Sequence, residues 1–120
     1  MRLLVCGGRD YRNRPLLFDT LDSRIGAIHL IISGGASGAD DLATEWARAR
    51  CVPYMVFPAN WEKYGNRAGP MRNLQMLMEG KPDFVLAFPG GKGTANMVRL
   101  AQEAKVEVRY SEDYPTGDSK

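Results

Sequence analysis

Short apolar segments alternate along the chain with longer segments whose apolar residues recur at helical spacing. Runs such as Leu30-Ile31-Ile32 and Phe84-Val85-Leu86-Ala87-Phe88 are apolar at every position, which is typical of strands covered on both faces of a parallel sheet. The pattern predicts five strands, at residues 2–6, 30–33, 53–57, 84–88 and 106–109.

The intervening segments predict four helices, at residues 15–25, 39–50, 70–79 and 94–104. Trp46 falls on the apolar face of the second helix, so we expect it in the core. In the third helix, Pro70 suits the first position and Gly80 the stop. The residues expected to pack that helix on the core are Met71, Leu74, Leu77 and Met78.

The alternation of strands and helices predicts an α/β fold, a Rossmann-like three-layer sandwich with one five-stranded parallel sheet. Right-handed crossovers favour the strand order 3-2-1-4-5. A chain of 120 residues supports a single core. We expect the domain to span residues 1–110. Residues 111–120 are polar, with Pro115 and Gly117, and predict a flexible, frayed tail.

Composition narrows the functional classes. Apolar residues make up 44% of the chain and charged residues 25%, and the net charge is +2, which is small for a nucleic-acid-binding surface. The apolar run Leu3-Leu4-Val5-Cys6 is too short for a signal-peptide core or a membrane span. Cys6 and Cys51 lie at opposite ends of their strands, which predicts free thiols and a cytoplasmic location.

Three glycine-rich loops directly follow strands, at residues 7–10, 34–40 and 89–94. The carboxyl ends of parallel strands share one edge of the sheet, so these loops converge beside the crevice between the first and fourth strands. Each loop alone could be an ordinary turn. Together, with two of them leading into helix N-termini, they predict a phosphate site.

Side chains near that edge add candidate contacts. Arg72, beside Asn73, lies in the first turn of a helix, where a cation is unfavourable unless an anion compensates. Ser37 and Asp40 have capping-box spacing, and Asp40 could also bind a ribose hydroxyl. The expected ligand-binding residues are Gly7, Gly8, Arg9, Gly34, Gly35, Ser37, Gly38, Asp40, Arg72, Asn73, Gly90, Gly91, Lys92, Gly93 and Thr94.

The long loop at residues 58–69 carries Trp61 and Tyr64. Such loops are commonly lids or binding loops. Trp61 or Tyr64 could stack on a base or could pin the loop to the domain, and the sequence leaves both alternatives open.

Other chemistries lack support. Lys92 precedes Gly93, so there is no GxxxxGK[ST] P-loop, and no GxGxxG occurs. The lone His29 precedes its strand, at the wrong edge for a Ser-His-acid triad. No group of residues has metal-ligand spacing, so we predict neither a metal nor a bound cofactor.

The segments 32–40, 61–76 and 88–94 together resemble the SLOG superfamily, and most closely its YspA/YpsA-related branch of small bacterial and phage proteins. The resemblance covers residues 3–108. It implies a Rossmann-like fold, recognition of nucleotides or nucleotide-derived signals, and a homodimer.

A related group, the Lonely Guy phosphoribohydrolases, cleaves nucleoside 5′-monophosphates and carries a PGGxGTxxE motif. Residues 89–94 are similar to its first part, but the motif's glutamate falls at Met97. The catalytic residues are therefore unknown. Arg72, Asp40 and Asp10 are the candidates, and Glu45 is a further carboxylate that does not match by position.

Three functions follow from these observations. The first is a module that senses or sequesters a nucleotide-derived ligand. The alternative is a nucleotide N-glycosidase, which the residue at Met97 weakens. The third, binding of single-stranded DNA, lacks a basic stripe.

Overall fold

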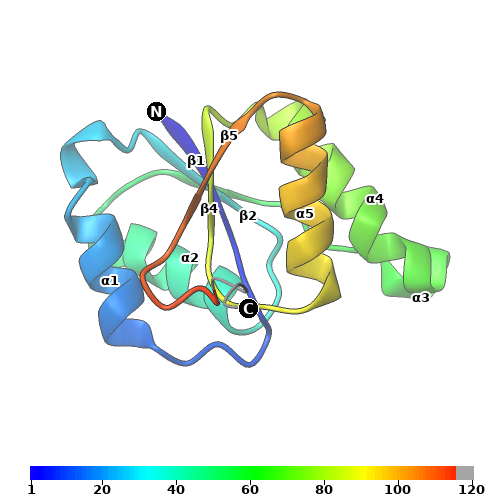
Figure 1. Cartoon of the computed structure of the whole chain (residues 1–120), viewed down its shortest axis with the longest axis horizontal. Helices are drawn as coiled ribbons and strands as arrows, with labels where there is room; N and C mark the ends of the chain where they lie inside the picture. The colour runs from blue at the N-terminus through cyan, green and yellow to red at the C-terminus, as the bar shows by residue number, and fades with distance from the viewer. Residues whose placement is uncertain (116–120) are drawn as a thin grey trace.

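The computed structural model describes residues 1–115. Five parallel strands form one sheet in the order β3-β2-β1-β4-β5, as predicted (Figure 1). Leu4 on the central strand is in register with Ile32 on one side and Val85 on the other. The strands are β1 (Arg2–Cys6), β2 (Leu30–Ser33), β3 (Tyr54–Val56), β4 (Phe84–Ala87) and β5 (Glu107–Tyr110).

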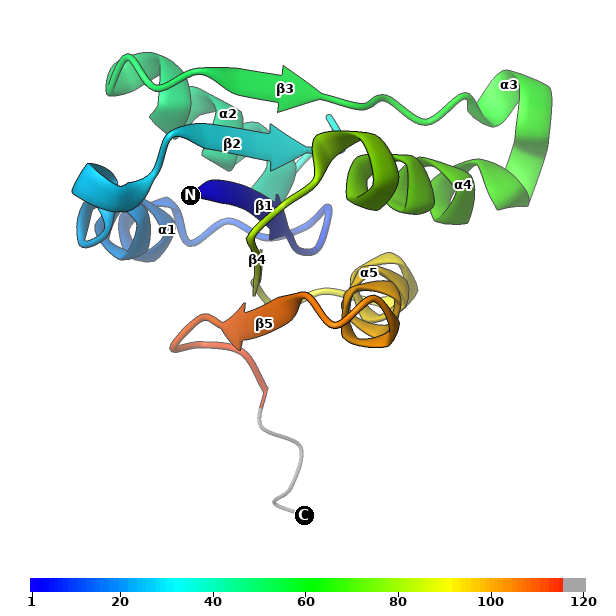
Figure 2. The same cartoon turned by 90° about the horizontal axis from the view of Figure 1, so that it is seen from above.

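Helices cover both faces of the sheet (Figure 2). On one face α1 (Arg14–Asp22) and α2 (Ala39–Ala49) bury an apolar cluster that includes Trp46. On the other face α4 (Ala68–Gln75), its π-helical continuation η3 (Met76–Gly80) and α5 (Lys92–Glu103) bury a second cluster. The predicted α/β fold and the core position of Trp46 are confirmed. Strands that are apolar on both faces need a layer of helices on each face of the sheet.

The segment expected as a loop at residues 58–69 is mostly helical. It forms α3 (Trp61–Tyr64), the 3₁₀ turn η2 (Gly65–Arg67) and the start of α4. The Asn60 side chain caps α3 by accepting a hydrogen bond from the Lys63 amide at 3.0 Å. Pro70 lies inside the first turn of α4, where its missing N–H leaves no intrahelical bond unmade.

The face of α4 and η3 that packs on the sheet also differs from the prediction, although Leu77 packs against the second apolar cluster as expected. Met71, Leu74 and Met78 are 41%, 47% and 66% exposed. The helix packs instead through a side that includes Gly69, Asn73, Met76 and Gly80. At Gly80 a Cβ would lie 3.2 Å from Ile32 Cδ1, so the small residue permits a close approach to β2.

The chain after β5 remains packed on the domain, so the fold extends past residue 110. The Ser111 amide donates to the Ala87 carbonyl at 3.0 Å, and the Tyr11 hydroxyl donates to Asp113 at 2.8 Å. Tyr114 packs against the second apolar cluster. The expected frayed tail therefore does not begin at residue 111, because these polar residues find partners; residues 116–120 lie outside the described part.

Two further features bear on the sequence predictions. Cys6 is buried and Cys51 is exposed, and both are free thiols. Within residues 1–115 no helix combines the length and apolar character that crossing a bilayer requires.

The two tryptophans give a test of the core. Trp46 is 0% exposed and donates its indole N–H to Asp22 at 2.8 Å, whereas Trp61 is 45% exposed. We expect Trp46→Ala to lower the free energy of unfolding by about 3–5 kcal/mol, because it leaves a large cavity. The control Trp61→Ala should cost less than about 1 kcal/mol. Urea denaturation followed by circular dichroism measures both, and equal losses would contradict this packing.

Candidate functional site

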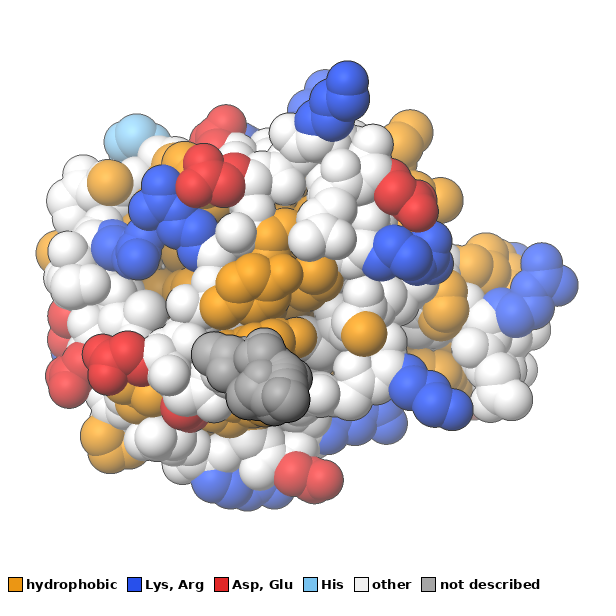
Figure 3. Space-filling view, viewed as in Figure 1, with side chains coloured by type: hydrophobic (Ala, Val, Ile, Leu, Met, Phe, Trp, Pro, Cys, Tyr) orange, Lys and Arg blue, Asp and Glu red, His pale blue; other side chains and the backbone are white. Residues whose placement is uncertain are grey.

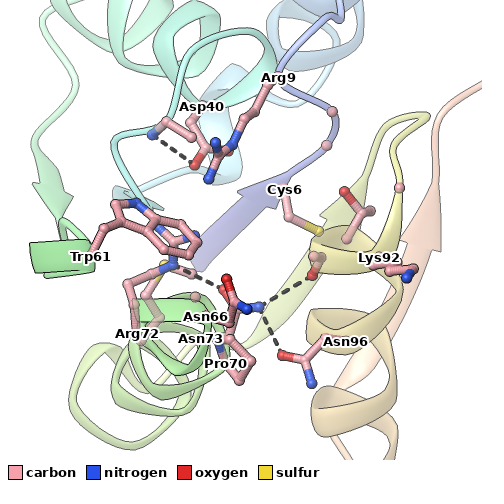
Figure 4. Close-up of a pocket in the computed structure, with 18 residues that line it drawn as sticks. Cys6, Arg9, Asp40, Trp61, Asn66, Pro70, Arg72, Asn73, Lys92 and Asn96 are labelled. Atoms are coloured by element: carbon pink, nitrogen blue, oxygen red, sulfur yellow. Dashed lines mark hydrogen bonds between the residues drawn. The ribbon is translucent and has the colours of Figure 1, made fainter. Parts of the chain in front are cut away.

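A cavity of about 570 Å³ opens at the carboxyl edge of the sheet, where the loops after β1 and β4 meet α4 (Figure 4). Three cations, Arg9, Arg72 and Lys92, line it together with one carboxylate, Asp40. The remaining lining residues are Cys6, Gly7, Gly8, Ala36, Trp61, Asn66, Gly69, Pro70, Asn73, Met76, Gly91, Gly93, Thr94 and Asn96.

The N-terminus of α5 presents open hydrogen-bond donors to this cavity. Its N-cap residue, Gly91, supplies no side-chain cap. Among the described residues, none accepts a hydrogen bond from the amides at positions 92–94 or pairs with the Thr94 hydroxyl, although Thr94 is only 5% exposed. A Cβ at Gly90 would collide with Thr94 Oγ1, so the preceding turn needs glycine. Free amides at a helix N-terminus favour an anion.

Arg72 reaches the cavity from α4 and is held at two points. Its Nη1 donates to the Gly34 carbonyl at 2.6 Å, and its Nε donates to Asn73 Oδ1 at 3.0 Å. These contacts use two of the five guanidinium N–H groups, which leaves three for a ligand. Burial lowers the pKa of Arg72, and the nearby Asp40 carboxylate opposes that shift. An arginine at this site remains a cation.

Asn73 fixes the position of Arg72 relative to α5. Asn73 is 4% exposed, and its Nδ2 donates to Asn96 Oδ1 at 2.9 Å and to the Gly93 carbonyl at 3.2 Å. The side-chain amide therefore links the two helices that flank the cavity. Asn96 was absent from the sequence prediction. Its position next to Met97, where the PGGxGTxxE motif has its glutamate, was the one available signal.

Asp40 organises the loop after β2. Its Oδ2 accepts hydrogen bonds from the Gly34 amide at 3.1 Å and the Ala36 amide at 3.2 Å. Burial raises the pKa of Asp40 to about 6, and the two amides and Arg72 oppose this shift only in part. The capping-box interpretation of Ser37 is wrong, because Gly38 is the N-cap of α2 and Ser37 donates to the Arg9 carbonyl at 3.3 Å.

The three loops contact one another directly. The Gly8 amide donates to the Pro89 carbonyl at 2.8 Å. Gly38 has φ +79°, and a Cβ there would collide with the Gly8 carbonyl. Several amides of the first two loops are thus paired within the protein, whereas those of α5 are open.

The two aromatic residues of segment 58–69, Trp61 and Tyr64, differ in whether they line the cavity. The Arg9 guanidinium lies 5.0 Å from the centre of the Trp61 ring, at the mouth of the cavity. Trp61, Arg9 and Arg72 also line a neighbouring cavity of about 300 Å³. Gly34, Gly35 and Ser37 line the same cavity. Tyr64 is 38% exposed and lines neither of these two cavities.

The other candidate carboxylates do not line the main cavity. Asp10 lines an adjoining hollow, which contains Gly90 and shares Gly8, Arg9 and Gly91 with the main cavity. Glu45 is exposed on α2 and pairs with Arg14 at 2.6 Å. Met97 is 1% exposed in the second apolar cluster, so the position of the hydrolase glutamate is occupied by a core side chain.

Comparison with known proteins agrees with this architecture. Residues 1–64 match the model of the YspA, cpYpsA-related SLOG family. The chain belongs to this family. It is 36% identical over 124 residues to the Gene 61 protein of Mycobacterium phage D29, and the match covers 95% of this chain and 98% of the phage protein.

A solved structure shows the same fold. The X-ray structure of TM1055 superposes with a TM-score of 0.68 at 21% identity, over 90% of this chain and 72% of TM1055. This likeness supports the Rossmann-like fold predicted from the sequence.

The raised pKa of Asp40 predicts a pH-dependent stability. Because the pKa rises from 3.8 to about 6 on folding, the folded state favours the protonated acid. The stability contributed by Asp40 is fully present below about pH 4 and is lost as the pH rises through about 6. The raised pKa corresponds to about 3 kcal/mol.

Asp40→Asn removes this dependence, since the amide stays neutral and its oxygen still accepts from the loop amides. Between about pH 4 and about pH 7 we expect the variant to gain about 2–3 kcal/mol relative to the wild type. Urea denaturation at both pH values measures the change. Asp41→Asn, which alters an exposed neighbour, is the control. A gain for Asp40→Asn no larger than for the control would contradict the buried-acid assignment.

Proposed function

We propose that this protein binds a phosphate-bearing nucleotide or nucleotide-derived signal at the carboxyl edge of its sheet, as a sensor or sequestering module. One observation carries the proposal. The unpaired amides of α5, the Thr94 hydroxyl and the free N–H groups of Arg72 all border one cavity. Its SLOG family membership points to the same class of ligand.

The electrostatics of the cavity favour an anion. Arg9, Arg72 and Lys92 face a single carboxylate, Asp40, which gives the lining a positive balance. Arginine matches phosphate in both charge and geometry, and hydrogen bonds to charged groups are the stronger kind. We assign the phosphate to the N-terminus of α5, with Arg72 as its counter-charge.

The part of the cavity beyond the phosphate subsite would hold the sugar and the base of the ligand. The volume of about 570 Å³ lies within the range of small-molecule sites. The loop at residues 34–38 would hold the sugar. Trp61, with Arg9 over its ring, offers an aromatic surface for a base.

Substitutions at the anion subsite test this assignment. Arg72→Ala should weaken binding of nucleoside 5′-monophosphates by about 10- to 100-fold, because a charged hydrogen-bonding partner is lost. Thr94→Val, which removes a hydroxyl at nearly constant volume, should weaken it by about 5- to 10-fold. Isothermal titration calorimetry measures both effects.

The controls separate charge from structure. Arg67→Ala removes an exposed arginine that does not line the cavity, and it should change affinity by less than about twofold. The matching nucleosides, which lack the phosphate, should bind weakly to every variant. Equal affinity for nucleoside and nucleotide, or equal effects of Arg67→Ala and Arg72→Ala, would overturn the assignment.

A second candidate function is hydrolysis of the N-glycosidic bond of a nucleoside 5′-monophosphate. Asp40 favours it, because a carboxyl with a pKa of about 6 beside the ligand suits a general acid. Its Oδ2 already accepts two loop amides, so the acid would act through Oδ1. Chromatography of the free base after incubation distinguishes the candidates. Rapid release that both Asp40→Asn and Arg72→Ala abolish would place the enzyme first.

Two further properties belong to the proposal. A cytoplasmic location is consistent with free Cys6 and Cys51. The protein would act as a homodimer, as the family resemblance implies.

A further inference from the structure

A second hollow, of about 510 Å³, adjoins the main cavity at the turn that follows β4. Its walls come from the loop after β1, from that turn and, through Asp113, from the chain after β5. In Figure 3, blue and red side chains occur along the lower margin of the molecule, where Figure 1 shows the loop after β1. The assignment of a phosphate to the main cavity leaves this hollow without a role.

The boundary between the hollow and the main cavity carries almost no side chains. Gly8, Arg9 and Gly91 line both spaces. A Cβ at Gly91 would meet no atom within 4 Å, so the space beside it is open. A Cβ at Gly90 would lie 2.7 Å from the Gly8 nitrogen and would also collide with Thr94. A ligand held at the N-terminus of α5 can therefore extend along this glycine turn into the second hollow.

Open hydrogen-bond donors continue across the boundary. The amides at positions 90 and 91, like those at 92–94, have no acceptor among residues 1–115. Thr94 adds its unpaired hydroxyl and is 5% exposed. Together with the free N–H groups of Arg72, these donors are enough for two linked phosphates.

The second hollow differs from the main cavity in its charge. Two carboxylates, Asp10 and Asp113, balance two guanidinium groups, Arg9 and Arg12. The main cavity has three cations and one carboxylate, which suits an anion. The balanced hollow suits a neutral group that both donates and accepts hydrogen bonds, such as a sugar.

The polar side chains of the hollow differ in what they are free to bind. Asp113 is occupied, because its two oxygens accept from the Ser111 and Tyr11 hydroxyls at 2.6 and 2.8 Å. Asp10 is exposed, and no described residue donates to its carboxylate. A free carboxylate accepts from sugar hydroxyls, as the acidic residue of a dinucleotide site does from ribose. Asn13 uses its Oδ1 to cap α1, which leaves its Nδ2 as a donor.

We propose that the second hollow holds a second sugar, so that the ligand is a nucleoside 5′-diphosphate sugar rather than a mononucleotide. This inference rests on the proposed phosphate site. The base lies at Trp61, the two phosphates follow the amides at positions 90–94, and the second sugar reaches Asp10. Arg9 lines the main cavity, the second hollow and the smaller cavity beside Gly35, so it can contact each part of such a ligand.

Isothermal titration calorimetry of the full chain compares AMP with ADP-glucose and UMP with UDP-glucose, so that the base is constant within each pair. We expect each sugar nucleotide to bind about tenfold more tightly than its monophosphate, because the second phosphate and the sugar add hydrogen bonds. Charge alone would not produce this gain, since both members of a pair carry about two negative charges near pH 7.

Asp10→Ala should remove most of this gain. We expect it to weaken both sugar nucleotides by about 5- to 10-fold and to leave both monophosphates within about twofold. Asp19→Ala makes the same change at an exposed residue of α1 that lines neither space, and it is the matched control. Both aspartates are exposed, so the circular dichroism spectra should not change.

Equal affinity of sugar nucleotide and monophosphate in both pairs would overturn the inference. An effect of Asp10→Ala on the sugar nucleotides no larger than that of Asp19→Ala would also overturn it. In either case, binding of AMP or UMP that Arg72→Ala weakens would leave the proposed phosphate site standing. Absence of binding for all four compounds would overturn the phosphate site and this inference with it.

Discussion

The meeting of three glycine loops at one edge of the sheet constrains everything else at the site. The Gly8 amide is bonded to the Pro89 carbonyl, and Gly38 approaches the Gly8 carbonyl too closely for any side chain. The Gly8 amide is therefore not available to a ligand. These contacts also bring the N-termini of α2 and α5 to the same crevice, as the parallel sheet requires. The amides at the N-terminus of α5 stay open among the described residues, whereas several amides of the other two loops are paired within the protein.

The two flanking loops are therefore different in kind. The loop after β2 is organised from within, since the buried carboxylate of Asp40 accepts two of its amides. The loop after β4 has no such internal acceptor among the described residues, and a hydroxyl and three amides remain open there. Asn73 and Asn96 join α4 to α5 and fix the Arg72 guanidinium between the two loops. An anion would complete this arrangement in the way that Asp40 completes the other.

The helical segment that carries Arg72 has two different faces. Gly69, Asn73, Met76 and Gly80 face the sheet or the cavity, whereas Met71, Leu74 and Met78 face outward. A helix that packs through glycine and asparagine comes close to β2, which sets the position of Arg72. The same packing leaves Met71, Leu74 and Met78 exposed.

The sequence alone determined the fold class, the strand order, the core position of Trp46 and the edge where the glycine loops gather. These follow from local periodicity and from the rule that parallel strands end together, which need no knowledge of contacts. Only the tertiary structure decided which face of α4 is buried, because periodicity identifies an apolar stripe but not what covers it. It also decided that Asp40 serves its own loop, that Ser37 is no cap and that Asn96 reaches the cavity. Each of these depends on distances in the folded chain, because residue type says which groups can donate or accept but not which of them meet.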